Sequence, residues 1–91
     1  MKINIHKADM QIITGEGYVG KVEFDVTGHK EAYELVLQSK KGNEWGYSLH
    51  FLHEPGPEEE MDAVDEYLDE NDEAFFEMVN AAKRALKSEG E

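Results

Sequence analysis

Apolar and polar residues alternate with a period of two through residues 2–53, which is the pattern of half-buried β-strands. Between the alternating runs lie short turn signals at residues 7–9, 15–17, 27–30 and 40–43. Each signal is short enough to join two strands as a hairpin. The pattern therefore predicts a five-stranded, mostly antiparallel sheet with meander topology, in which each strand turns one apolar face inward.

The clearest of these runs is the last one, where four large apolar residues alternate with small or polar ones. Trp45, Tyr47, Leu49 and Phe51 should point to one side. Aromatic residues at this spacing, followed by an amphipathic helix, usually form a core, so we interpret the run as the inner face of a central strand. The core predicted from the whole pattern comprises Val22, Phe24, Leu35, Leu37, Trp45, Leu49, Phe51, Val64, Leu68, Phe75, Val79 and Leu86.

After the turn at residues 54–57 the apolar period changes to that of a helix, and Pro57 suits the first helical position. We favour two helices within residues 58–88, with Asn71 or Asp72 capping the second. The alternative is a single helix with a heptad-like seam in which Asn71 is the polar position. Such a helix would be roughly 46 Å long, longer than the sheet of so small a domain, and would require a second chain to cover it.

The length of 91 residues fits a single α+β domain, residues 1–91. We expect a β-sheet half at residues 1–53, a Pro/Gly turn at 54–57 and an acidic helical half at 58–88 packed on one face of the sheet. Cysteine is absent, which excludes disulfides and thiolate metal sites. The N-terminal residues lack the apolar run of a signal peptide, and no later segment resembles a membrane span. We therefore expect a cytoplasmic protein without membrane contact.

The negative charge of the chain is concentrated in one region. Residues 1–53 carry six basic and seven acidic side chains, whereas residues 54–91 carry three and fourteen, and the whole chain has a net charge of −12. Residues 54–77 hold twelve carboxylates and no Lys or Arg. This asymmetry predicts one strongly negative surface. The predicted partner-binding acidic face consists of Glu58, Asp62, Asp65, Glu66, Asp69, Glu70, Glu73 and Glu77.

If this acidic segment is helical, its carboxylates repel one another. It contains six pairs of carboxylates four residues apart, and each pair costs roughly 0.2 to 0.5 kcal/mol at low salt. A solvated face that keeps the protein soluble is one interpretation. A recognition surface for a basic protein is the other, since eleven carboxylates along about 30 Å of helix come within a factor of two of the phosphate density of duplex DNA. The same charge argues against direct nucleic-acid binding by this chain.

The sequence contains only weak matches to known ligand-binding motifs. Residues 15–20 match G-x-G-x-x-G, but a dinucleotide site needs a helix after the glycines, and residues 21–26 alternate like a strand. A hairpin turn with a bulge or a close backbone approach explains these glycines better. The acidic run at 69–74 resembles a calcium loop, yet Ala74 stands where the turn needs Gly and Asn80 where a bidentate Glu closes the site. We therefore assign no catalytic, cofactor-binding or metal-binding residues.

These observations predict a small non-enzymatic interaction module that acts through its acidic helical surface, through homodimerisation by its helices, or both. One alternative is a phosphate or DNA mimic that inhibits a basic nucleic-acid-binding protein. The other is a small ligand-binding domain or enzyme that uses a cleft between sheet and helices.

Overall fold

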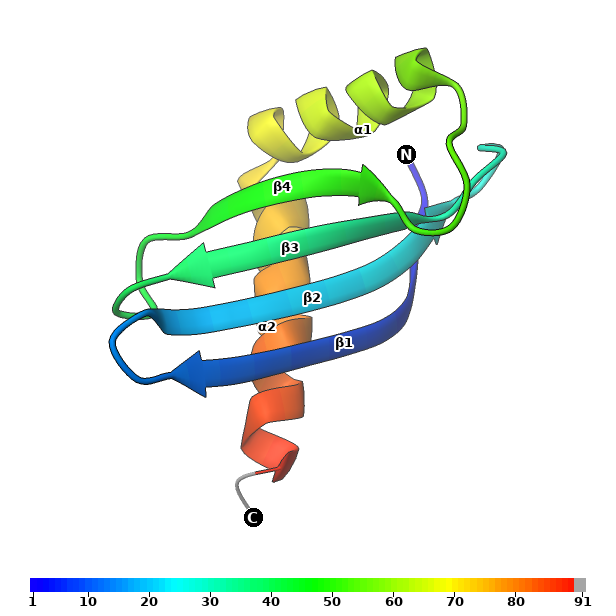
Figure 1. Ribbon diagram of the computed structural model, residues 1–91. Coiled ribbons are helices and arrows are strands. Elements are labelled where there is room, and N and C mark those ends of the chain that lie inside the picture. The colour runs from blue at the N-terminus through cyan, green and yellow to red at the C-terminus, as the bar shows by residue number, and fades with distance from the viewer. Residues whose placement is uncertain (90–91) are drawn as a thin grey trace.

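The chain folds into an antiparallel sheet followed by two helices, in a computed structural model that describes residues 1–89 (Figure 1). The strands are β1 (Ile3–Ile13), β2 (Gly17–Val26), β3 (Tyr33–Ser39) and β4 (Gly46–Phe51). The helices are α1 (Glu58–Glu70) and α2 (Asp72–Glu89). Their order confirms the predicted α+β class, with an antiparallel sheet before a C-terminal helical layer.

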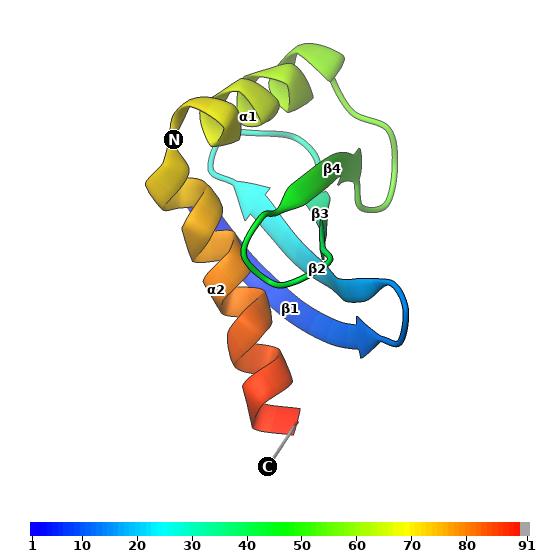
Figure 2. The ribbon, with the colours of Figure 1, turned by 90° about the vertical axis from the view of Figure 1, so that its left-hand side faces the viewer.

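The strands follow one another in the sheet in the order β1-β2-β3-β4, and each neighbouring pair is antiparallel. Helix α2 crosses one face of the sheet, over β1 and β2, and α1 runs crosswise to it on the β4 side (Figures 1 and 2). The other face of the sheet has no helix over it in the described part of the chain. The fold therefore has one buried sheet face and one open one.

The core lies between the inner face of the sheet and the helices. Seven of the predicted core residues are fully buried: Val22, Phe24, Leu35, Leu37, Val64, Leu68 and Val79. The other five, Trp45, Leu49, Phe51, Phe75 and Leu86, pack against this cluster while partly exposed. The predicted core did not include Tyr33, although it alternates in phase with Leu35 and Leu37; it is fully buried and stacks between Phe24 and Phe51 with ring centroids 5.5 Å apart on each side. Burial of this apolar area is the main source of stability for the domain.

The prediction of five strands is wrong, because the sheet has four. The turn expected at residues 7–9 does not form, and β1 continues through it. Its pairing with β2 shifts register between Ile5 and Lys7, which is a β-bulge at His6. The extra residue reverses the alternation, so the inward positions change from Ile3 and Ile5 to Ala8 and Met10. In the sequence, this reversal of the apolar–polar alternation has the same pattern as a turn between two strands.

The last strand is also placed differently from the prediction. Strand β4 pairs only with β3 in the described chain, so it is an edge strand and not a central one. Trp45 precedes the strand, whereas Tyr47, Leu49 and Phe51 lie on it. These residues do face the core, as expected, but remain partly exposed at this edge of the sheet.

Two helices, and not one, follow the sheet, as predicted. The break lies at Asn71, whose backbone angles φ −121° and ψ 89° are not helical. The Asn71 N–H and its side-chain Nδ2 each donate to the carbonyl of Tyr67 at 2.9 Å, and the Asn71 carbonyl accepts from the N–H of Phe75 at 3.1 Å. One residue thus ends α1 and begins α2 with its polar groups satisfied. The continuous seam of the single-helix alternative does not form.

The glycines at residues 15–17 belong to the β1–β2 hairpin, as predicted. Gly15 and Gly17 have φ of +85° and +97°, a region that favours glycine. A Cβ at Gly17 would lie 2.4 Å from the carbonyl oxygen of Ser39 on the neighbouring strand, whereas a Cβ at Gly15 would meet nothing within 4 Å. Lys21 follows within β2 and not in a helix. The glycine motif therefore has a structural explanation in turn geometry and close backbone approach.

Candidate acidic interface

Helix α1 carries its carboxylates outward because its apolar residues are turned to the sheet. Val64 and Leu68 are buried on its inner side, with Met61 and Tyr67 partly buried beside them. The remaining positions of the helix are mostly acidic and mostly exposed. All eight residues of the predicted acidic face, Glu58, Asp62, Asp65, Glu66, Asp69, Glu70, Glu73 and Glu77, are exposed.

The structure does not bring these eight residues into one row. Six lie on α1, but Glu73 and Glu77 lie on α2, which runs in another direction after Asn71 (Figure 2). Helix α1 alone holds eight carboxylates in its 13 residues. At 1.5 Å per residue this is one carboxylate per roughly 2.4 Å of helix. The densest negative surface is therefore α1, and the acids of α2 extend it at an angle.

Asp65 is tied to the sheet and is not a free member of this face. The Tyr47 hydroxyl on β4 donates a hydrogen bond to Asp65 Oδ1 at 2.6 Å. Burial, followed by this hydrogen bond and the negative charges of Asp65 and Asp69, raises the pKa of Tyr47 to about 12. Sequence reasoning missed this contact, because the two residues are 18 positions apart and nothing in the period of either element links them.

Glu60 makes a second link between α1 and the sheet region. Its Oε1 accepts a hydrogen bond from the backbone N–H of Lys30, in the β2–β3 connection, at 3.0 Å. Both links use carboxylates as acceptors for neutral donors, so they hold α1 in place without neutralising its charge. The exposed carboxylates that make no such link in the described chain are Glu58, Glu59, Asp62, Glu66, Asp69 and Glu70, and we call them the α1 acidic surface.

No Lys or Arg side chain of the described residues forms an ion pair with a carboxylate of α1. Of the six repelling pairs predicted from the sequence, four lie within α1 and Glu73/Glu77 lies within α2. The sixth, Asp69/Glu73, straddles the break at Asn71, where helical spacing does not apply. The repulsion is therefore concentrated in α1, and packing of its inner face must offset it.

A chain of aromatic rings borders the acidic surface. Tyr47 lies 5.3 Å from Phe75, centroid to centroid, and Phe75 lies 6.0 Å from Phe76, which is 50% exposed on the outer side of α2. Farther along α2, the Lys83 amine lies 5.6 Å over the ring of Trp45. The sequence predicted Phe75 as core and did not include Phe76 in the predicted core.

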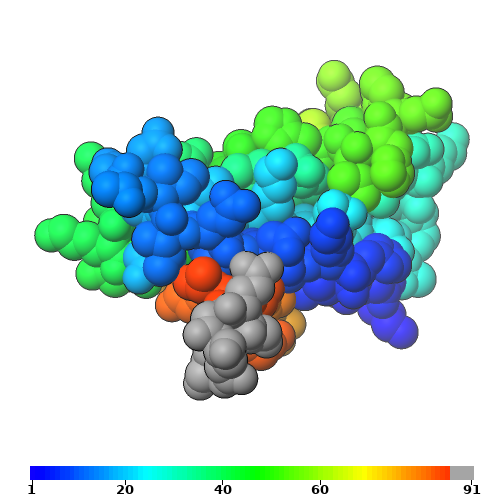
Figure 3. Space-filling model, turned by 60° about the horizontal axis from the view of Figure 1, so that its bottom comes forward, coloured from blue at the N-terminus to red at the C-terminus, as the bar shows by residue number. Residues whose placement is uncertain are grey.

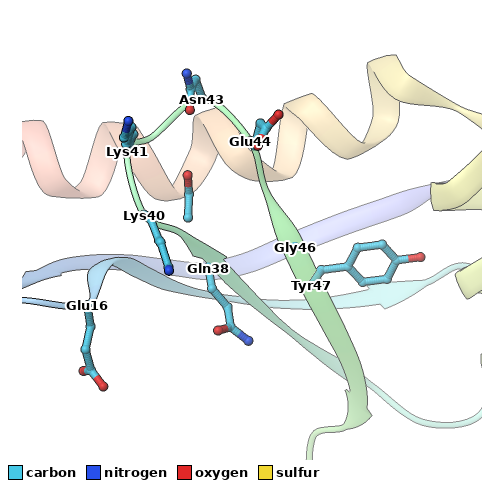
Figure 4. Close-up of a pocket in the computed structure, with 9 residues that line it drawn as sticks. Glu16, Gln38, Lys40, Lys41, Asn43, Glu44, Gly46 and Tyr47 are labelled. Carbon is cyan, nitrogen blue, oxygen red and sulfur yellow. The ribbon is translucent and has the colours of Figure 1, made fainter.

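The hollows of the surface do not resemble enclosed ligand sites. The largest of those described has a volume of about 770 Å³ and lies open at the β3–β4 loop (Figure 4). Glu16, Gln38 and Lys40 point to one side of it, and Lys41 and Asn43 to the other, so its polar groups are divided between two sides (Figure 4). A crevice between β1 and the helices measures only about 100 Å³, below the roughly 300 Å³ of a typical ligand pocket.

Three further observations bear on function. Among the described residues, no three His, Asp or Glu side chains group as ligands for a metal ion. Neither helix combines the length and the apolar character needed to cross a bilayer, as far as the chain is described. No protein-family model, curated protein or solved structure matches the chain. The site must therefore be interpreted from its own chemistry.

Proposed function

We propose that this protein is a non-enzymatic binding module whose α1 acidic surface recognises a basic segment of another protein. The observation that carries the proposal is the density of exposed carboxylates on α1, which have no Lys or Arg partner among the described residues. A basic partner would supply the missing counter-charges. The requirement for several matched charges would also give the interaction a steep dependence on salt.

The energetics of α1 favour this interpretation over a merely solvated face. Four pairs of like charges within one helix cost roughly 1 to 2 kcal/mol at low salt, a sizeable part of the stability of a small domain. Solubility alone does not require that arrangement, since interspersed acids would give the same net charge without the repulsion. A partner that binds across the row would convert the repulsion into attraction.

A phosphate mimic is a special case of this function, and one observation favours it. The carboxylates of α1 recur every roughly 2.4 Å along a straight rod, compared with one phosphate charge per roughly 1.7 Å of duplex DNA. In this case the basic partner would be a nucleic-acid-binding protein, and the module would compete with its nucleic acid. The chain itself would not bind nucleic acid.

The test is a pull-down from cell lysate with purified protein as bait, at low and at high salt, and with the retained proteins identified by mass spectrometry. The first variant, Asp62→Asn/Glu66→Gln/Glu70→Gln, neutralises one row of α1 and spares Asp65, which holds Tyr47. The control variant, Glu16→Gln/Glu44→Gln/Glu54→Gln, removes three exposed carboxylates outside the helices. Both variants change the net charge equally, so only the location of the charge differs.

We expect basic proteins to be retained by the wild-type and control baits at low salt, and to be lost at high salt and with the α1 variant. Equal retention by both variants would show that net charge, and not the α1 acidic surface, is responsible, and would overturn the proposal. If the retained protein binds nucleic acid, added duplex DNA should displace it from the bait in the phosphate-mimic case only.

A further inference from the structure

Strand β1 has a free edge. It is the longest strand, with 11 residues, and it pairs only with β2 in the described chain. Helix α2 passes behind the sheet and does not lie along this edge, so β1 remains at the surface when the molecule is viewed from its side (Figures 1 and 3). The opposite edge differs, because α1 lies beside β4. A long unpaired edge is a template for another strand.

Two hydrogen bonds establish which peptide groups of β1 point outward. The Thr27 N–H donates to the Lys2 carbonyl at 3.0 Å, and the Glu16 N–H donates to the Ile13 carbonyl at 2.9 Å. Both bonds show that the carbonyls of Lys2 and Ile13 point toward the β2 side. In the register of the two strands these residues lie opposite Thr27 and Gly17, so the peptide groups of the odd-numbered β2 residues face β1. By the alternation of an antiparallel ladder, the N–H and C=O of Ala8, Met10 and Ile12 then point away from β2.

Apolar side chains accompany this free edge. Three of the four large apolar residues that are exposed in the described chain, Met1, Ile5 and Ile12, lie on β1 or immediately before it. Ile12 is the most exposed of them, at 61%. It pairs with Tyr18 of β2 and therefore lies on the side of the sheet that α2 covers. Exposure of apolar groups beside unpaired backbone indicates a surface that another chain covers.

We propose that a second copy of this chain pairs with this edge, with residues 7–13 of the two copies antiparallel in a continuous eight-stranded sheet. The alternation of inward- and outward-pointing peptide groups along β1 determines the pairing register between the two copies. The outward-pointing residues Ala8, Met10 and Ile12 pair with one another across the two-fold axis and keep their apolar side chains on the helix side. On the open side of the sheet, Asp9 of each copy faces Gln11 of the other, and Lys7 faces Ile13.

Charge also selects a second copy as the occupant. Residues 7–13 carry one Lys and one Asp and are neutral overall, in a chain with a net charge of −12. The α1 acidic surface lies at the opposite edge, beside β4, so the dimer places the two acidic surfaces at its far ends. Their separation would exceed several Debye lengths of roughly 8 Å at physiological salt, and their repulsion would be screened.

The bulge sets the limit of the pairing. At His6 the strand is distorted, and the His6 ring is held by the Asp25 carboxylate of β2. Bulges and charged residues protect edges from continued pairing. The regular part of the edge therefore begins at Lys7, and the seven residues from there to Ile13 are comparable in length to β3.

The test combines molar mass in solution with hydrogen exchange. Light scattering after size exclusion should give about twice the 10.4 kDa of the chain at high concentration. Exchange measured by NMR should slow markedly for the N–H groups of Ala8, Met10 and Ile12 as the dimer forms. Ile12→Pro removes an outward N–H without affecting the bonds to β2, and we expect it to weaken dimerisation about 30-fold or more, since the symmetric interface loses the bond twice.

Two further variants make the result decisive. Ile12→Lys keeps the N–H but adds a charge to the same edge, and it should also yield monomers. Phe76→Lys changes the exposed apolar residue of α2, and it should leave the dimer intact. A monomeric wild-type protein would overturn the proposal. So would a dimer that Phe76→Lys disrupts, or one in which those three N–H groups exchange rapidly. None of these results depends on a basic partner, so the proposed function is tested separately.

Discussion

At the scale of single residues, Tyr47 connects the sheet to the acidic helix. Its hydroxyl donates to Asp65 while its ring packs against Phe75. Tyr47→Phe keeps the ring and removes the hydrogen bond, so we expect a loss of about 1 kcal/mol in the free energy of unfolding, measured by urea denaturation. Tyr18→Phe is the control, because the Tyr18 ring packs on Trp45 and its hydroxyl has no hydrogen-bond partner in the described chain. An equal loss in both variants would contradict this role.

The same hydroxyl makes stability depend on alkaline pH. The pKa of Tyr47 is raised from 10.0 to about 12 in the folded protein. The unfolded chain therefore loses this proton first, and the stabilisation that is complete below pH 10 is lost as pH rises toward 12. The difference in stability between wild type and Tyr47→Phe should shrink over that range. In the wild-type protein, the absorbance of tyrosinate should show one tyrosine that titrates near pH 12, and Tyr47→Phe should lack this titration. If the variant keeps the titration, the group responsible is Tyr33, whose pKa is also raised by burial.

Two glycines of one turn differ in what they tolerate. Both have positive φ, but a Cβ at Gly17 would strike the Ser39 carbonyl, whereas Gly15 has open space. Gly15→Ala should cost about 1 to 2 kcal/mol from backbone strain alone. Gly17→Ala should cost clearly more, because strands β2 and β3 must separate. Thermal unfolding of the two variants measures the difference, and similar melting temperatures would show that the close approach relaxes without cost.

At the scale of elements, the sequence predicted the helices better than the strands. Period and capping are local, so the two helices, their break near Asn71 and the outward acids could all be inferred. The bulge at His6 could not, because it is defined by the partner strand and reverses the alternation that strand prediction depends on. Likewise, the link of Asp65 to Tyr47 arises only from how α1 settles beside β4.

Repulsion within α1 is a property of this element and can be relieved there. Glu66 has acidic neighbours four residues away on both sides, Asp62 and Glu70. Glu66→Lys converts two repelling pairs into attractive ones and should raise the free energy of unfolding by roughly 0.5 to 1.5 kcal/mol at low salt. Glu16→Lys makes the same charge change in the β1–β2 turn and should have a smaller effect. Denaturation in low and high salt checks both, and an effect that salt does not reduce would contradict an electrostatic cause.

At the scale of the whole molecule, the two edges of the sheet have opposite characters. The β4 edge lies beside the charged helix α1, and the β1 edge is neutral, apolar in part and unpaired in the described chain. The core leaves only a small crevice between β1 and the helices, so both candidate binding surfaces lie on the outside. Such a division permits both edges to be used at once, with the module presenting two acidic surfaces when it is paired through β1.

Salt should therefore separate the two proposed interactions on the same sample. Binding of a basic partner to α1 brings together opposite charges and should weaken by roughly tenfold or more between 50 and 500 mM NaCl. Pairing through β1 buries apolar side chains and backbone hydrogen bonds between neutral segments, so its dissociation constant should change little, or tighten slightly as the net charge of −12 is screened. Sedimentation velocity at a series of salt concentrations, with and without a basic partner, measures both. A dimer that dissociates in high salt would contradict pairing through β1, because the single Lys and the single Asp of residues 7–13 leave the paired segments neutral.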